Sequence, residues 1–399
     1  MNTHTKLALA TGLTAALALA APLASAASSA PAAPEPTPAP LYTSANAVPG
    51  KYIVTLEKGV DAAKAAQRLR LSPSYVYGSA LNGFAVPMNP LQLTIVRNSP
   101  GVKSVEEDAK VMSAPMRASM SGTRAPSSSW GLDRIGQKKL PLDDDFSTQG
   151  NGAGVTAYIL DTGIDYAHDE FGGRATFGYD AVSALAKGQD CNGHGTHVAG
   201  TVGGKTYGVA RKVSLVSVRV LDCDGSGQWS GIIAGLDWVA KNAKQPAVLN
   251  GSLGGDRSDA VNNAANALSE AGVLPVIAAG NSSKDACTVS PASASGVLTV
   301  AASNSYDEET SFSNYGQCVS VYAPGQAIVS AKLSGGSVAL NGTSMAAPHV
   351  AGVAALYKAA HPTAAPSEIT EFIDAESTKD VLGSISKSSP NRLLFTGGL

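Results

Sequence analysis

The chain has 399 residues, of which 44% are hydrophobic and 15% are charged, so it can bury a large core in two or three domains. The formal net charge is −2 and no run of basic residues occurs, which argues against nucleic acid as a partner. The composition therefore predicts a folded, nearly neutral protein.

The N-terminus has the features of a secretion signal. Lys6 precedes an apolar stretch at 7–23, and Ala24-Ser25-Ala26 forms a small-residue cleavage site. A membrane anchor is the alternative, because roughly 20 apolar residues span a bilayer. The Thr, Gly and Pro residues of this stretch favour a signal peptide that is cleaved off over a membrane anchor that stays. We therefore predict a signal peptide at 1–26, a flexible Ala/Pro-rich linker at 27–46, and an extracellular protein without a membrane contact.

The next region, 47–112, predicts a small α+β domain. Its apolar spacing indicates strands that alternate with helices, and two β-α-β passes favour a ferredoxin-like sandwich. The expected strands are 51–56, 82–87 and 102–107, and the expected helices are 61–71 and 90–98. A polar segment with Gly and Pro at 113–122 suits a cleavable connector, with the mature start between Ala114 and Thr123.

The remaining region, 123–399, predicts an α/β domain. Short apolar runs suit buried parallel strands, and helical stretches at 230–242 and 256–271 alternate with them. The runs are 213–220, 247–249, 273–279 and 298–301. This alternation predicts a mostly parallel sheet covered by helices on both faces, with ligands bound beyond the carboxyl ends of the strands.

Three segments supply the groups that activate a serine. Asp161 ends a strand-like run, His194 lies between two glycines at an apparent helix start, and Ser344 opens an alanine-rich helix. Pro348 suits the first turn of that helix. A carboxylate can orient an imidazole, which takes the hydroxyl proton while the oxygen attacks a carbonyl. We therefore predict Asp161, His194 and Ser344 as catalytic residues with no catalytic cofactor, and His197 and His349 as structural residues.

These segments resemble the three signatures of subtilisin-like serine proteases, and the sequence around them resembles the aqualysin-like members of the proteinase K branch. The resemblance begins at Trp130-Gly131-Leu132-Asp133-Arg134-Ile135 and continues to the end of the chain. Region 47–112 resembles the inhibitory propeptide of such enzymes. The resemblance implies a secreted, monomeric serine endopeptidase that cleaves proteins and peptides and is made as a self-processing zymogen. An accessory domain is the alternative for 47–112.

The resemblance also assigns an oxyanion hole and substrate contacts. Asn281 would donate its side-chain amide to the oxyanion beside the backbone N–H of Ser344, although a turn residue is the alternative. A substrate would add as a strand between glycine-bearing segments, and small uncharged walls favour apolar or aromatic residues before the scissile bond. Trp229 either lines the S4 pocket or belongs to the core. The assigned substrate residues are Gly225, Ser226, Gly227, Trp229, Ser252, Leu253, Gly254, Ala278, Ala279 and Gly280.

Four cysteines in a chain with a secretion signal predict disulfides, and sequence alone allows three connectivities. Zinc binding is disfavoured, because no two cysteines lie two to four residues apart. The resemblance implies the pairs Cys191–Cys223 and Cys287–Cys318.

A structural calcium is the one metal that the resemblance implies. Asp133, Gln137 and Asp143 could supply oxygen ligands near the mature start. Gly136 and Ser320 stand where relatives carry carboxylates, so a solvated acidic turn is the alternative. Gly251 also departs from the family, which usually has a large apolar residue there. We expect either a small void or a looser pocket wall at that position.

Two other classes compete with a protease. A silent binding protein on the same fold would need a broken triad, and all three residues are present. A lipase or esterase usually carries G-x-S-x-G, whereas Ala346 stands at the closing position here.

Overall fold

A computed structural model describes residues 37–113, 117–118, 130–386 and 388–399 of the chain. The predicted signal peptide at 1–26 lies outside the described residues. So do residues 27–36 of the linker and, apart from Arg117 and Ala118, the segment that contains the predicted mature start. Within the described ranges, no helix is both long enough and apolar enough to cross a membrane.

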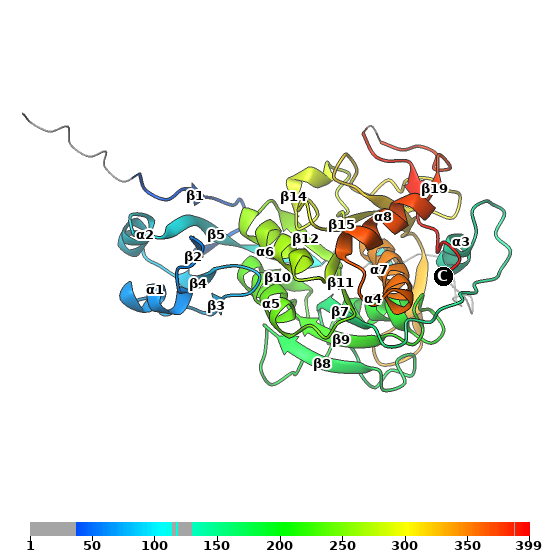
Figure 1. Cartoon of the computed structure of the whole chain (residues 1–399), viewed down its shortest axis with the longest axis horizontal. Helices are drawn as coiled ribbons and strands as arrows, with labels where there is room; N and C mark the ends of the chain where they lie inside the picture. The colour runs from blue at the N-terminus through cyan, green and yellow to red at the C-terminus, as the bar shows by residue number, and fades with distance from the viewer. Residues whose placement is uncertain (1–36, 114–116, 119–129, 387) are drawn as a thin grey trace, which may run out of the picture. The chain divides into compact units, whose positions relative to one another are not determined.

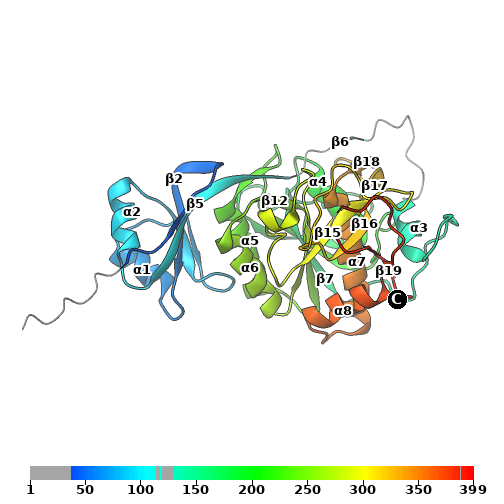
Figure 2. The same cartoon turned by 90° about the horizontal axis from the view of Figure 1, so that it is seen from above.

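The N-terminal region has the predicted ferredoxin-like topology. Its strands lie in the order β5-β2-β4-β3, and both helices cover one face of this sheet (Figure 2). Buried side chains such as Val54, Phe84 and Val105 fill the space between the two layers. The elements are β2 (Ala47–Leu56), α1 (Ala62–Arg68), β3 (Tyr75–Tyr77), β4 (Gly83–Pro87), α2 (Pro90–Arg97) and β5 (Val102–Ser113).

The linker predicted to extend to residue 46 ends earlier. Strand β1 (Leu41–Tyr42) pairs in parallel with β5, so that Leu41 lies opposite Val105. Ala39 is buried, and its N–H donates to Arg97 O at 2.7 Å. The apolar side chains of this short segment therefore join the small domain, because β5 offers them a free strand edge.

The large domain contains the predicted parallel sheet, in the order β19-β20-β16-β15-β13-β11-β7-β9-β8. Every pair is parallel except β19 with β20. The strands are β7 (Thr156–Asp161), β8 (Ala175–Asp180), β9 (Ser214–Arg219), β11 (Ala247–Gly251), β13 (Leu274–Ala278), β15 (Leu298–Ser303), β16 (Val321–Pro324), β19 (Thr378–Lys379) and β20 (Arg392–Leu393).

Helices cover both faces of this sheet, as predicted (Figure 1). Along β7, Ala157 and Ile159 pack into the core that contains α4 and α7, whereas Tyr158 and Leu160 pack into the core that contains α5 and α6. Successive strand residues point to opposite faces, so one strand feeds two cores. The helices are α3 (Trp130–Gly136), α4 (His194–Gly203), α5 (Trp229–Asn242), α6 (Asp259–Glu270), α7 (Thr343–Ala360) and α8 (Pro366–Glu376).

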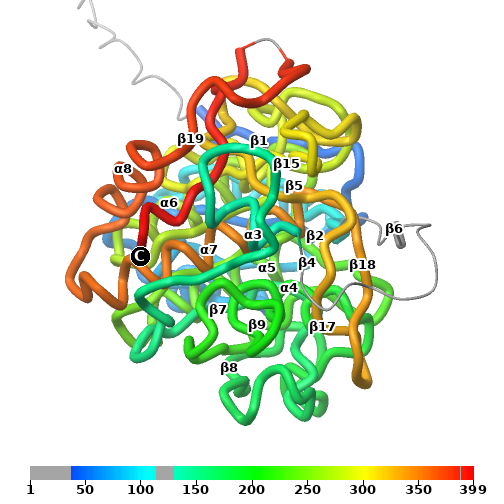
Figure 3. The backbone as a smooth tube through the Cα atoms, turned by 90° about the vertical axis from the view of Figure 1, so that its right-hand side faces the viewer, coloured from blue at the N-terminus to red at the C-terminus, as the bar shows by residue number. Residues whose placement is uncertain are grey.

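Short antiparallel strands lie outside the main sheet. β10 (Ser226–Gln228) and β12 (Leu253–Asp256) both pair with β5, and β14 (Val289–Ser290) pairs with β12. β17 (Ile328–Ala331) and β18 (Ser337–Asn341) run side by side (Figure 3). The backbone of β6 (Arg117–Ala118) pairs with β18. A 3-10 turn, Ala286–Thr288, precedes β14.

Both disulfides implied by the resemblance are confirmed. The S–S distances are 2.05 Å for Cys191–Cys223 and 2.09 Å for Cys287–Cys318. The first joins the segment before α4 to the segment before β10.

The position of Gly251 is filled by a neighbouring side chain. The Cδ1 atom of Ile277 lies 2.7 Å from the point that a Cβ of Gly251 would occupy. Ile277 therefore takes the space that a larger residue would need, and a void is not required to accommodate the glycine.

Candidate active site

The three predicted catalytic residues begin or end elements at one edge of the sheet. Asp161 is the last residue of β7, His194 the first of α4 and Ser344 the second of α7. The Asp161 Oδ1 and His194 Nδ1 atoms are 2.7 Å apart. The other imidazole nitrogen, Nε2, is buried and has no hydrogen-bond partner among the described residues. The Ser344 hydroxyl donates to Ser252 O at 3.3 Å.

The pKa of His194 lies above its usual value of 6.5. Burial lowers this pKa. The charge of Asp161, the hydrogen bond to Asp161 and the charge of Asp190 raise it and outweigh the effect of burial. An imidazole beside two carboxylates is therefore easy to protonate, which suits a group that must take a proton from a hydroxyl.

Two hydrogen-bond donors converge beside Ser344. Asn281 Oδ1 accepts from Thr343 N at 2.8 Å and from Thr343 Oγ1 at 3.0 Å, which leaves the Asn281 amide free to point away. A Cβ on Gly342 would lie 3.4 Å from Asn281 Nδ2 and 3.5 Å from Ser344 N. Because Gly342 has no side chain, this point stays open. An oxyanion there would meet both predicted donors.

Sequence reasoning missed Asn314, which holds the loop that carries Asn281. Its Nδ2 donates to Ala279 O at 2.8 Å, and its Oδ1 accepts from Ser282 N at 3.0 Å and from Lys284 N at 3.1 Å. Gly280 has a φ of +104°, and Asn314 Nδ2 lies 2.4 Å from the point that a Cβ there would occupy. No local pattern marks Asn314, because its partners lie about thirty residues away along the chain.

The first turn of α7 differs from the prediction, because Pro348 is the sixth helical residue. A proline there has no N–H for the carbonyl of Ser344. Ser252 Oγ donates to that carbonyl at 2.9 Å and accepts from Asn250 Nδ2 at 2.9 Å. Ser252, predicted as a substrate residue, therefore braces the catalytic helix with its side chain. Asn250 was not predicted.

The end of the N-terminal domain occupies the predicted substrate edges. Strand β5 runs antiparallel between β10 and β12, with Met112 opposite both Ser226 and Gly254. Ser113, predicted to start the connector, still belongs to β5 and donates its N–H to Gly225 O at 2.7 Å. In the same register, Gly227 lies opposite Val111 and Leu253 lies opposite Ser113. This segment of the chain thus binds as a substrate strand would.

A cavity of about 380 Å³ lies beside this strand, and its walls include Ser344 and Asn281. Of the predicted residues, Leu253, Gly254, Ala278 and Gly280 also line it. Ala279 instead packs into a buried apolar cluster.

Trp229 belongs to the core, which is one of the two alternatives that the sequence left open. It is buried in the core that α5 shares with the sheet. A Cβ on Gly255 would also lie 2.9 Å from Trp229 Cζ2 and 3.6 Å from Val111 Cγ2. The indole and the Val111 side chain of β5 therefore meet at Gly255, which makes Trp229 both a core residue and a floor below the bound strand.

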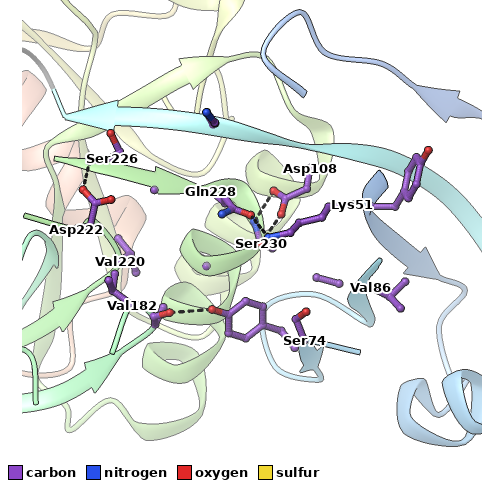
Figure 4. A pocket seen from close by; sticks show the side chains of 17 residues that line it. Lys51, Ser74, Val86, Asp108, Val182, Val220, Asp222, Ser226, Gln228 and Ser230 are labelled. Carbon is purple, nitrogen blue, oxygen red and sulfur yellow. Dashed lines mark hydrogen bonds between the residues drawn. The ribbon is translucent and has the colours of Figure 1, made fainter. Parts of the chain in front are cut away.

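Two carboxylates of β5 bind the N-termini of α5 and α6. Asp108 accepts from Ser230 N at 3.0 Å and Ser230 Oγ at 2.5 Å (Figure 4). Glu106 accepts from Ser258 Oγ at 2.7 Å and Ala260 N at 2.8 Å. Burial raises the pKa of both carboxyl groups, and the hydrogen bonds oppose this rise. The small domain thus supplies helix caps to the large one.

Further contacts surround these caps. Asp237 of α5 accepts from the N–H groups of Gly78, Ser79 and Ala80 at 3.1, 2.7 and 2.7 Å. Lys51 Nζ donates to Gln228 Oε1 at 3.1 Å beside a polar cavity of about 600 Å³ (Figure 4). The two domains therefore meet through charged side chains as well as through the backbone pairing of β5 with β10 and β12.

The chain also pairs with the strand that leads into α7. In β6, the backbone of Arg117 lies opposite Asn341 and that of Ala118 opposite Leu340. Asn341 ends β18, which leads directly into Gly342 and the catalytic helix. The sequence did not predict this strand, because two residues within a polar connector give no periodic signal.

The predicted calcium ligands are engaged with the protein itself. The Asp133 carboxylate accepts from Asp143 N at 3.4 Å and Asp144 N at 2.8 Å. The Gln137 amide nitrogen donates to the carbonyl groups of Lys139 and Pro141. Among the described residues, no cluster of three or more His, Cys, Asp or Glu side chains could hold a metal ion. The Gln137 Oε1 atom, the oxygen that would bind calcium, is buried and has no hydrogen-bond partner among the described residues.

The buried residues His197 and His349 have the neutral form expected of structural histidines. His197 Nε2 lies 3.0 Å from Ile328 O and 3.1 Å from Val338 O, and burial lowers the pKa of His197 to about 3. His349 Nδ1 lies 2.8 Å from Met345 O, and burial lowers the pKa of His349 to about 4.

Comparison with known proteins agrees with this arrangement. Residues 152–391 match the subtilase family and residues 51–113 match peptidase inhibitor I9. The chain is 44% identical over 377 residues to an extracellular serine proteinase of Thermus sp. (strain Rt41A), covering 88% of this chain and 90% of that protein. It is 48% identical over 322 residues to alkaline serine exoprotease A of Vibrio alginolyticus, covering 80% of this chain and 60% of that protein.

A solved structure extends the likeness to the fold. The crystal structure of a cold adapted subtilisin-like serine proteinase aligns with a TM-score of 0.67 and 48% identity, covering 68% of this chain and 98% of that one. The chain therefore belongs to the subtilase family, as a serine endopeptidase zymogen with an I9 inhibitory propeptide.

Proposed function

We propose that this protein is a secreted endopeptidase of broad specificity that cuts peptide bonds through an acyl-enzyme on Ser344. His194 takes the hydroxyl proton and returns it to the leaving amine, and Asp161 orients the imidazole. Asn281 Nδ2 and Ser344 N stabilise the oxyanion. The observation that carries this proposal is the 2.7 Å contact between Asp161 and His194, at the same edge of the sheet as the paired donors.

The preferred substrates have an apolar or aromatic residue before the scissile bond. The cavity beside Ser344 has small, uncharged walls at Gly254, Ala278 and Gly280, which supports this preference. Extended backbone pairing on β10 and β12 supplies affinity without selecting a side chain, which supports broad specificity.

The zymogen is cut by its own active site between Ser113 and Arg117. The chain pairs with β10 and β12 up to Ser113, and with β18 from Arg117 onwards. Ser113 and Ser344 line the same cavity, and β18 leads directly into the segment that carries Ser344, which supports a scissile bond between the two pairings. After the cut, β5 remains in the cleft as an inhibitor.

The mature enzyme acts outside the cell as a monomer. The predicted signal peptide and the name of the Thermus relative, an extracellular proteinase, support the location. We propose that the turn at Asp133 and Asp143 is held by its own hydrogen bonds and needs no calcium. An equal melting temperature in calcium and in a chelator would agree with this proposal, and a drop in the chelator would contradict it.

Expression of the full chain with Ser344→Ala tests the proposed function. The wild type should release a shortened product and hydrolyse casein, whereas the variant should stay uncut and inactive. The expected loss in kcat is on the order of 10⁶-fold, a magnitude measured in subtilisin. A short-chain ester assay beside casein separates a protease from an esterase. Normal processing of the variant, or ester hydrolysis without casein hydrolysis, would overturn the proposal.

A further inference from the structure

A second buried carboxylate lies next to the catalytic pair and takes no part in the mechanism described above. Asp190 is only 4% exposed and precedes His194 by four residues. Its Oδ1 accepts from Thr162 Oγ1 at 2.9 Å, Asn192 N at 2.9 Å and Gly193 N at 3.0 Å. Its Oδ2 accepts from Thr196 N at 3.0 Å and Thr196 Oγ1 at 2.6 Å. The carboxylate therefore closes the loop that leads into α4.

The same carboxylate reaches the strand that carries Asp161. Thr162 follows Asp161, and its N–H donates to Asp161 Oδ1 at 2.7 Å. The Thr162 hydroxyl donates to Asp190 and accepts from Gly195 N at 2.9 Å. Thr196 Oγ1 in turn accepts from Asp165 N at 3.0 Å. Hydrogen bonds thus link the end of β7 to the start of α4 on both sides of the catalytic pair.

We propose that Asp190 is a positioning residue of the catalytic centre, which uses Thr162 and Thr196 to hold the Asp161 carboxylate and the His194 imidazole in register. The inference rests on the proposed function and deepens it. Thr162 and His194 are both less than 2% exposed, so water cannot replace these hydrogen bonds without local opening. A small displacement of a catalytic base costs much of the rate.

The charge of Asp190 adds a second effect. It raises the pKa of His194, together with the larger effect of Asp161. The other groups around His194 are His197 on the same helix, which stays neutral because burial lowers its pKa to about 3, and the uncharged hydroxyl of Ser344 on α7. Removing the charge of Asp190 should therefore shift the acid limb of the rate profile to lower pH.

Asp190→Asn tests both effects in the mature enzyme. An asparagine must turn an N–H₂ group toward either the three donors at Oδ1 or the two at Oδ2, so part of the network is lost. We expect kcat on a peptide anilide to fall at least tenfold with KM nearly unchanged. The acid limb of kcat/KM should move to lower pH. Active-site titration corrects for unfolded enzyme.

Asp180→Asn is the matched control. The Asp180 side chain is 1% exposed, lies 3.4 Å from Arg219 Nη1, and accepts from the N–H groups of Val182, Ser183 and Gly188, so it holds the loop at 180–188 and not the loop before His194. This variant should lose stability, but the acid limb of its kcat/KM profile should lie at the same pH as in the wild type. The proposal would be overturned if the acid limb of kcat/KM shifted equally in both variants. It would also be overturned if Asp190→Asn changed neither kcat nor the acid limb.

Thr162 provides a second test if Asp190→Asn does not mature. Thr162→Val removes the bridging hydroxyl but keeps the charge of Asp190, so kcat should fall at least tenfold without a shift of the acid limb. Thr162→Ser should restore kcat to within threefold. Wild-type kcat in Thr162→Val would overturn the inference. A wild-type enzyme that does not cleave casein would instead overturn the proposed function.

Discussion

The starts of two pairs of helices serve different purposes in this molecule. Helices α4 and α7 begin after glycines, Gly193 and Gly342, and neither has a side-chain cap. Helix α5 also lacks a side-chain cap of its own, but Asp108 of the propeptide binds its first turn, and Glu106 does the same for α6. The first-turn N–H groups of α4 bind side chains around the catalytic pair, Gly195 N to Thr162 and Thr196 N to Asp190, whereas a cap from a removable domain links folding to inhibition.

The open start of α7 gives the largest expected effect. Gly342→Ala would place a methyl group 3.4 Å from Asn281 Nδ2 and 3.5 Å from Ser344 N, where the oxyanion must lie. Because this blocks the hole, kcat should fall about 10²–10³-fold, the magnitude measured for loss of one oxyanion donor in subtilisin.

Gly173→Ala is the control for backbone strain. Both glycines have a positive φ, +153° at Gly342 and +78° at Gly173. No atom lies within 4 Å of the point that a Cβ of Gly173 would occupy. This variant should lose about 1 kcal/mol of stability with kcat unchanged. A similar kcat for both variants, after active-site titration, would contradict an open oxyanion hole at Gly342.

The capped starts of α5 and α6 should matter for inhibition and not for turnover. Asp108→Ala and Glu106→Ala each remove the acceptor for two donors, which costs roughly 1–2 kcal/mol per cap. After self-cleavage, the propeptide should therefore dissociate about 5–30 times more readily. The rate at which casein hydrolysis appears after processing measures this release.

Glu107→Ala is the matched control for the caps. Glu107 lies between the two capping residues in β5, and its carboxylate accepts from Ser44 N within the propeptide. It should release the propeptide at the wild-type rate. Equal release by all three variants would mean that the caps do not contribute to inhibition.

The start of α4 predicts the pH dependence of turnover. In the proposed mechanism neutral His194 is the active form, and its pKa lies above 6.5, so kcat/KM should fall about tenfold per pH unit below that pKa. His197, one turn along α4, stays neutral over this range because burial lowers its pKa to about 3. A single ionisation above pH 6.5 in the acid limb would agree, and a flat profile from pH 5 to 9 would disagree.

The proline in α7 leads to a prediction about stability. Ser252→Ala removes the donor that replaces the missing N–H of Pro348 and leaves the Ser344 carbonyl buried without it. We expect a loss of about 1–3 kcal/mol in the free energy of unfolding. Urea unfolding of the inactive Ser344→Ala background measures this loss without self-digestion. Unchanged stability would mean that another group satisfies the carbonyl.

The small domain illustrates how well local patterns predict elements and how poorly they predict ends. The strand expected at 102–107 extends to Ser113, because β10 and β12 of the large domain offer it partners. The linker expected to reach residue 46 ends before β1 for a similar reason, because β1 pairs with β5. Pairing with a distant strand is invisible to the spacing of neighbouring side chains.

The sequence by itself predicted Asp161, His194 and Ser344 and the elements that carry them, because each lies in a local pattern of strand end, turn glycine or helix start, and the family resemblance added Asn281. Only the tertiary structure decided the roles of Asn314, Ser252 and Asp190. Their hydrogen bonds join segments roughly thirty to ninety residues apart along the chain. A buried polar side chain acquires its role from whichever backbone groups the fold brings to it, and that convergence has no sequence period.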